Sequence, residues 1–128
     1  MKKVVVEAHE YNTNFMSYIT GIPENLSSQV NSSLKNVENY DFNVFELDRI
    51  IQKKTLYCVL TYILNKFEFI KELLVESKYV NFVNEIISGY NRNVVYHNDL
   101  HAADVLQTTY VLITKGNLIS VNTDLLNF

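Results

Sequence analysis

Apolar residues spaced three or four positions apart predict that this chain is helical. Over residues 55–67, the side chains of Leu56, Leu60, Ile63 and Phe67 fall on one face of an α-helix. Because this spacing covers more than three turns, the segment is expected to pack one side against a hydrophobic core.

Three other segments predict helices for the same reason. Residues 78–90 end near Gly89, which fits a helix stop, and residues 41–51 form a shorter candidate. A fourth helix is predicted over residues 98–114, ahead of a Lys-Gly exit. The apolar positions of the first two segments are Tyr79, Val83, Ile86, Ile87 and Tyr90, and Val44, Leu47 and Ile51. Since no alternating strand pattern of useful length is present, we expect an all-α fold.

The composition indicates one small globular domain. The 128 residues are 48% hydrophobic and include only 3 Gly and 1 Pro, which argues against a disordered or collagen-like chain. The longest unbroken apolar run, residues 56–60, is far too short to span a membrane. Because Cys58 is the single cysteine and the N-terminus lacks a secretory signal, we expect a cytoplasmic protein in which this thiol is a core side chain.

The charge balance argues against nucleic acid as a partner. A net charge of −3 and a pI near 5.5 give no positive field to attract phosphate backbones. The Lys53-Lys54 pair is short and more typical of a solvated surface than of a binding site.

Composition also divides the chain. Residues 1–38 contain the only proline and a polar, serine-rich stretch, so we interpret them as an N-terminal appendage of loop or short helix. Residues 39–128 have the apolar spacing typical of helices and form the predicted domain. Residues 118–128 are apolar around a helix-entry signal, and we expect from this pattern a fragment or a truncated gene product.

Candidate chemistry is concentrated in residues 96–107, which read YHNDLHAADVLQ. On a helical wheel, His97, His101, Asp104 and Thr108 lie within about 60° of one another, opposite an apolar side that can pack. That apolar side consists of Ala103, Leu106, Tyr110 and Ile113. If Asn98 is the N-cap, however, His97 precedes the helix and its direction is not fixed by the wheel.

A pair of histidines four residues apart suits two kinds of chemistry. Imidazole binds divalent metals such as zinc, and it transfers protons near neutral pH. The alternative is structural, with two partly buried histidines hydrogen-bonded to neighbouring helices.

Residues around the histidines favour the chemical interpretation. The stretch closely resembles the motif of class I 3′,5′-cyclic nucleotide phosphodiesterases, the all-helical HD-domain-like hydrolases. The matching positions are Tyr96, His97, Asn98, His101, Ala102, Asp104, Val105 and Gln107. Residues 40–47 resemble the segment by which that family enters its catalytic domain, so the resemblance covers residues 39–128 and corresponds to the N-terminal part of the catalytic domain.

The resemblance implies a role for four residues. His97 matches the histidine that protonates the leaving O3′ oxygen, and His101 matches the first histidine ligand of the zinc-type metal. Tyr96 matches a tyrosine close to the cyclic nucleotide, and Asp104 is expected to orient a histidine through a hydrogen bond. The implied reaction is hydrolysis of cAMP, cGMP or both to the 5′-monophosphate in cyclic nucleotide signalling, with two divalent ions of the Zn²⁺ type and the Mg²⁺ or Mn²⁺ type.

The chain departs from the family pattern in its metal ligands. The family completes its metal site with a His-Asp pair in a following helix and a later aspartate, and the chain contains neither. We therefore expect the 128-residue chain alone to be inactive. One alternative is a catalytically dead phosphodiesterase-like interaction or scaffolding module, whose exposed helix faces an oligomer or a partner chain would cover. Another is an unrelated all-α structural protein with a chance motif.

Overall fold

The protein is helical over the described part of the chain, residues 22–116 of the computed structural model, and the predicted all-α fold is confirmed there. No strand occurs in these residues. The α-helices are α3 (Ser27–Lys35), α4 (Val44–Ile51), α5 (Thr55–Leu64), α6 (Glu68–Leu73), α7 (Glu76–Ser88) and α8 (Asp99–Lys115). Short 3₁₀ helices are η1 (Glu24–Leu26), η2 (Asn36–Glu38) and η3 (Gln52–Lys54).

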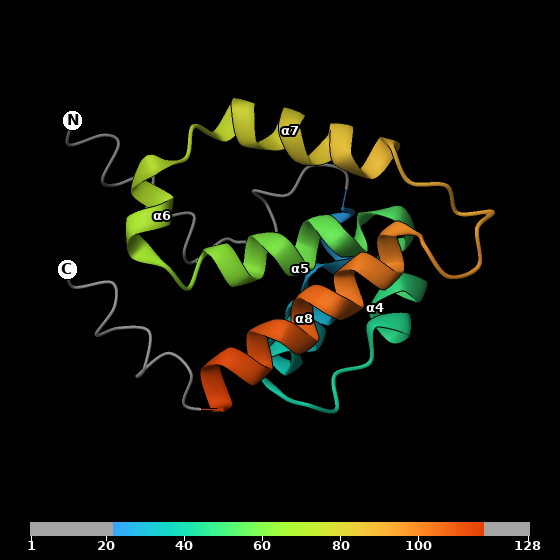
Figure 1. Ribbon diagram of the computed structural model, residues 1–128, viewed down its shortest axis with the longest axis horizontal. Helices are drawn as coiled ribbons and strands as arrows, with labels where there is room; N and C mark the ends of the chain where they lie inside the picture. Colours follow the sequence, from blue (N-terminus) through green and yellow to red (C-terminus); the bar gives the residue numbers. More distant parts are fainter. Residues whose placement is uncertain (1–21, 117–128) are drawn as a thin grey trace.

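Helix α5 is the centre of the fold. Figure 1 shows it between α7 and α8, and most of its residues are buried on every side rather than on one stripe. A helix that is apolar all round belongs in the interior. The apolar spacing therefore predicted one packed face of α5, whereas the structure buries the other faces as well. Cys58 is among the buried residues, as predicted, and burial raises the pKa of its thiol to about 12 although Lys54 lowers it.

The predicted helix over residues 55–67 is wrong at its C-terminal end. Helix α5 stops at Leu64, and the side-chain amide of Asn65 donates to the Thr61 carbonyl 2.9 Å away. Phe67 is extended and begins the separate short helix α6. After Leu64 the backbone changes to tighter bonds, from Lys66 N–H to the Ile63 carbonyl at 3.0 Å and from Phe67 N–H to the Leu64 carbonyl at 3.1 Å. The apolar spacing did not reveal this break.

Helix α3 belongs to the same core as the rest of the molecule. Val30, Leu34 and Val37 are almost fully inaccessible and cluster with Leu47 and Val59 of α4 and α5. These three side chains lie in the segment that the sequence assigned to an appendage. The predicted division after residue 38 stays a prediction, since residues 1–21 lie outside the described part, as do residues 117–128 with the expected tail.

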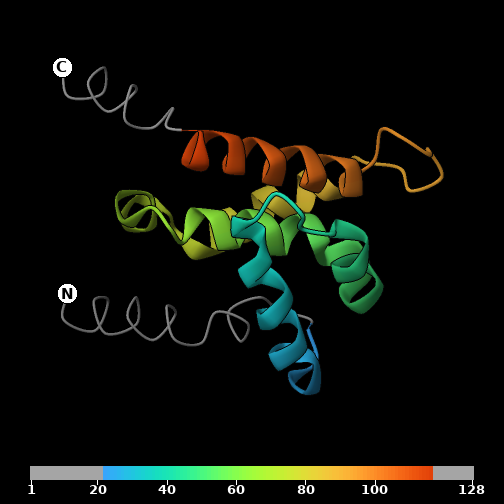
Figure 2. The ribbon, with the colours of Figure 1, turned by 90° about the horizontal axis from the view of Figure 1, so that it is seen from below.

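Helix α8, which contains residues 99–107 of the candidate motif, packs across α5. Figure 2 shows α8 and α3 on opposite sides of α5. The fully buried stripe of α8 consists of Asp99, Ala103, Gln107 and Val111, one residue per turn. Leu106 and Tyr110, which were expected on the packing side, are only partly buried against the core.

Hydrogen bonds connect α8 to the segment after α3. The side-chain amide of Gln107 donates to the carbonyls of Val37 and Asn39, at 2.9 and 2.8 Å. The Tyr110 hydroxyl donates to the Glu38 carboxylate; burial and this carboxylate raise the pKa of the phenol. These bonds fix the position of α8 along its own axis relative to the core, and therefore where its N-terminus lies. In the described residues, no helix has the length and apolar character needed to cross a membrane.

We predict that Gln107→Leu lowers the free energy of unfolding by about 1–3 kcal/mol. The carbonyls of Val37 and Asn39 would lose their donor in a buried setting. Urea denaturation followed by circular dichroism measures the change. Thr108→Ala, at the next and exposed position of α8, is the control and should stay within about 0.5 kcal/mol of the wild type. An equal effect of both variants would contradict the prediction.

Candidate functional site

The candidate site lies where the loop after α7 enters α8. Asn98 is the N-cap of α8, because its side-chain oxygen accepts the backbone N–H of His101 at 2.9 Å. Its side-chain amide donates to the Val94 carbonyl at 3.0 Å, which ties the loop to the helix end. His97 therefore precedes the helix, and the helical wheel does not set its direction.

The structure brings three of the four predicted site residues together as a cluster of rings. The Tyr96 and His101 ring centroids are 4.3 Å apart at an interplanar angle of 35°. The His97 ring stands edge-on to both, 5.0 Å from Tyr96 and 6.2 Å from His101. Neither imidazole forms a hydrogen bond to a described residue, and each contacts the other two rings of the cluster. The structural alternative expected hydrogen bonds from the histidines to neighbouring helices, and the described contacts include none.

The fourth predicted residue, Asp104, is half-buried on α8. It follows His101 by three positions, a spacing that makes two side chains neighbours on a helix surface. Among the described contacts, however, Asp104 forms no hydrogen bond to a histidine. Thr108, one turn further, is exposed.

An open cavity of about 530 Å³ adjoins the ring cluster. His97, Asn98 and His101 form its polar side, at the N-terminal end of α8. Its other walls are mainly apolar and come largely from the next turns of the same helix. These residues are Tyr90, Ala102, Val105, Leu106 and Thr109. Polar groups at one end of a mainly apolar wall are a combination that small-molecule sites commonly show.

The donor chemistry at this site fits a zinc-type ion only in part. The His101 imidazole is a normal zinc ligand, and its ring nitrogens are not engaged by a described residue. Within residues 22–116, no group of three or more His, Cys, Asp or Glu side chains is arranged to hold a metal ion. Further ligands from outside this part of the chain are needed to complete such a site.

An ionic network that the sequence pattern did not predict lies beside the site. The guanidinium of Arg92 donates to Asp48 of α4 at 2.9 and 3.0 Å, and to Asp99 of α8 with one bond at 2.8 Å and a second, shorter one. Hydrogen bonds to Asp99 and Asp48 raise the pKa of Arg92 above its already high value. The Thr55 hydroxyl donates to Asp48 at 2.7 Å, which extends the network to α5. No periodicity links Arg92 with Asp48, because they are far apart in sequence.

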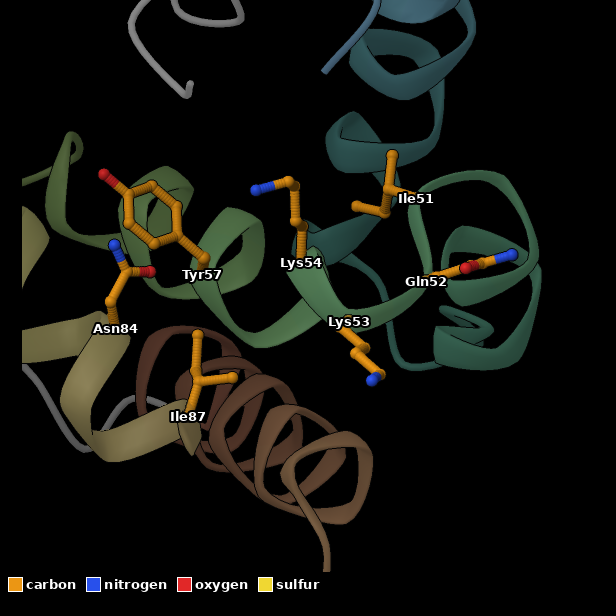
Figure 3. Close-up of a pocket in the computed structure, with 7 residues that line it drawn as sticks. All are labelled: Ile51, Gln52, Lys53, Lys54, Tyr57, Asn84 and Ile87. Carbon is orange, nitrogen blue, oxygen red and sulfur yellow. The ribbon is translucent and has the colours of Figure 1, made fainter. Parts of the chain in front are cut away.

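A second cavity lies away from the ring cluster, between η3 and α7. Figure 3 shows its lining residues, which enclose about 340 Å³. The ammonium groups of Lys53 and Lys54 point in different directions, so they do not converge on one ligand. Gln52 begins this turn with φ 51° and ψ −126°, a conformation that favours glycine. The Gln52 carbonyl lies 2.9 Å from the Thr55 hydroxyl oxygen, as a second acceptor beside Asp48 for its single proton.

Known proteins similar to this chain are cyclic nucleotide phosphodiesterases. The chain is 26% identical over 107 residues to the dual specificity calcium/calmodulin-dependent 3′,5′-cyclic nucleotide phosphodiesterase 1B of Mus musculus. It is 26% identical over 106 residues to the 3′,5′-cyclic-AMP phosphodiesterase 4C of Rattus norvegicus, and 27% over 106 residues to the 3′,5′-cyclic-AMP phosphodiesterase, isoform F, of Drosophila melanogaster. No family model and no solved structure matches.

The extent of these matches bears on the predicted resemblance. Each covers 82% of this chain, but the chain spans only about a fifth or less of the relatives' length, at 20%, 20% and 16%. The aligned part is longer than residues 39–128, so the similarity also includes residues before Asn39. The matches support the resemblance to phosphodiesterases, and the helical fold agrees with it.

We predict that Asn98→Ala lowers the free energy of unfolding by about 1 kcal/mol, because the first turn of α8 loses its side-chain acceptor. Asn98→Ser keeps an acceptor and is the matched control, with a loss under about 0.5 kcal/mol. Thermal denaturation of both variants checks the difference. Equal melting temperatures would show that the cap does not stabilise α8.

We predict that Gln52→Gly raises the free energy of unfolding by about 1 kcal/mol. Relief of the positive φ is worth roughly 1–3 kcal/mol, which exceeds the added entropy of glycine in the unfolded chain. Gln29→Gly, at an exposed position inside α3, is the control and should lower stability by about 1 kcal/mol. Chemical denaturation that gives a loss for both variants would overturn the prediction.

Proposed function

We propose that this chain carries part of the active site of an enzyme that hydrolyses 3′,5′-cyclic nucleotides to 5′-nucleoside monophosphates. The observation that carries the proposal is the cluster of Tyr96, His97 and His101 beside an open cavity at the start of α8. The similarity to cyclic nucleotide phosphodiesterases supports it at the level of reaction class.

His97 is the proposed proton donor. Its imidazole is exposed at the polar end of the cavity, where it can receive a proton from solvent and deliver it to a bound ligand. A water oxygen attacks phosphorus and releases a proton to solvent, and the bond from phosphorus to O3′ breaks. The O3′ oxygen takes the proton of His97, which leaves a free 3′-hydroxyl and a 5′-monophosphate. Protonation of a leaving oxygen by a positioned histidine contributes typically about 10²- to 10⁴-fold to the rate.

His101 is the proposed metal ligand on this chain. The helix fixes its backbone, and Tyr96 covers one face of its ring. Divalent ions of the zinc type and the magnesium or manganese type would neutralise phosphate oxygens and acidify a bound water. Their remaining ligands are proposed to come from outside residues 22–116.

Tyr96 and Asp104 complete the proposed assignments. Tyr96 is exposed beside both imidazoles, so it can contact a cyclic nucleotide that enters the cavity. Asp104 is proposed to orient a histidine by hydrogen bond when the site is complete, from its place one turn beyond His101. By itself, the 128-residue chain is proposed to be inactive.

A second candidate function is an interaction module. Val95 is 95% exposed, and Val105 and Leu112 on α8 are 49% exposed. Apolar side chains on the same element as the ring cluster favour a surface that another segment or chain covers. This function requires no catalysis by His97.

A chimera tests the proposed function. Residues 22–116 replace the matching segment of the mouse phosphodiesterase 1B, which supplies the rest of an enzyme. We predict that the chimera hydrolyses cAMP or cGMP with Mg²⁺ and Zn²⁺ present. His97→Ala in the chimera should lower kcat by about 10²- to 10⁴-fold, because the leaving oxygen loses its proton donor.

Two controls accompany this assay. Val95→Ala changes an exposed residue of the same loop and should leave turnover unchanged. His101→Ala should reduce bound zinc, as measured by atomic emission. A folded chimera with no turnover would contradict the proposal and favour the interaction module. Turnover that His97→Ala leaves intact would remove the proton-donor role.

A further inference from the structure

The loop that carries Tyr96 and His97 has little burial to hold it. It joins α7 to α8 without regular structure, and most of its residues are exposed, with Val95 at 95%. Loops with few apolar contacts open at low free energy. The arrangement of the ring cluster therefore needs another source of order.

Arg92 holds the loop through ion pairs. Its guanidinium makes paired hydrogen bonds to both Asp48 and Asp99, with three distances of 2.8 to 3.0 Å and a shorter fourth. The Asp99 side chain is only 3% exposed, so breaking this pair would leave a buried carboxylate without its partner. Paired contacts of a planar guanidinium fix direction as well as distance.

We call the paired bonds of Arg92 to Asp48 and Asp99 the clamp. Its members Arg92 and Asp99 lie on either side of the part of the loop that contains Tyr96 and His97. Arg92 precedes Tyr96 and His97, whereas Asp99 is the first residue of α8. In the same loop, Val94 N–H donates to the Asn91 carbonyl at 3.0 Å, and the Asn98 side-chain amide donates to the Val94 carbonyl. The ion pair thus closes a short ring of backbone. Asp48 anchors this ring to α4 and, through the Thr55 hydroxyl, to α5.

The His97 imidazole contacts the Tyr96 and His101 rings and forms no hydrogen bond to a described residue. Its direction therefore depends on the backbone that the clamp holds. We propose that Arg92, held by Asp48 and Asp99, is the positioning residue that sets the proton donor His97 and the Tyr96 ring against His101. This inference rests on the proposed function for the role of His97 but on geometry alone for the clamp.

Nuclear magnetic resonance of the 128-residue chain tests the clamp without any activity. The Tyr96 ring lies 4.3 Å from the His101 ring, so its ring current shifts the His101 carbon-bound protons. Tyr96→Leu gives the position of these signals without the stack. Arg92→Gln should move them by more than roughly half of that difference, because the loop loses its paired bonds. Arg92→Lys keeps the charge without the paired geometry and should have an intermediate effect.

Arg49→Gln is the matched control, since Arg49 is exposed on the same helix as Asp48 and forms no ion pair with a described residue. It should leave the His101 signals at their wild-type positions. Wild-type signals in a folded Arg92→Gln chain would overturn the proposal. If that variant does not fold, Arg92→Lys decides by the same criterion, and wild-type positions again overturn it.

The chimera separates the clamp from the proposed function. With active wild-type protein, Arg92→Gln should lower kcat roughly 10- to 100-fold and leave KM nearly unchanged, because a misplaced proton donor slows chemistry without removing a substrate contact. A change confined to KM would contradict the positioning role. If the chimera is inactive, the proposed function fails, whereas the shifts in the chain still decide whether Arg92 orders the ring cluster.

Discussion

The buried face of α8 contains two polar side chains, and the fold depends on a partner for each of them. Asp99 meets Arg92, and Gln107 donates to two backbone carbonyls. A polar group taken out of water without a partner costs more than most single contacts return. These partners therefore favour the observed register of α8 on α5. That register places the start of α8, and with it the ring cluster, at the edge of the core.

Much of the local structure could be predicted from the sequence. The N-cap at Asn98 and the stop at Gly89 are encoded by neighbouring residues, because capping is a contact within one turn. Helix α3 was only loosely anticipated, as loop or short helix, because its apolar positions are few among serines and asparagines. The break after Leu64 was missed, because the apolar spacing continues to Phe67 whereas the backbone bonds change to a tighter pattern after Leu64.

The candidate site, like the fold, could be predicted from the sequence only in part. A motif within twelve residues pointed to Tyr96, His97 and His101, and the structure brings their rings together. The contacts that support them come from elsewhere in the chain. Asp48 lies on another helix, and its pairing with Arg92 follows from tertiary packing rather than from spacing. The residues that bear chemistry were thus visible in the sequence, whereas the residues that hold them were not.

Cys58 can serve as a probe of how the core opens. Its sulfur is fully inaccessible in the middle of α5, and a pKa of about 12 leaves almost no thiolate at neutral pH. A thiol reagent in solution can therefore react only during moments when α5 separates from its neighbours. When the reagent reacts faster than the helices reclose, the rate of modification equals the rate at which α5 separates from its neighbours.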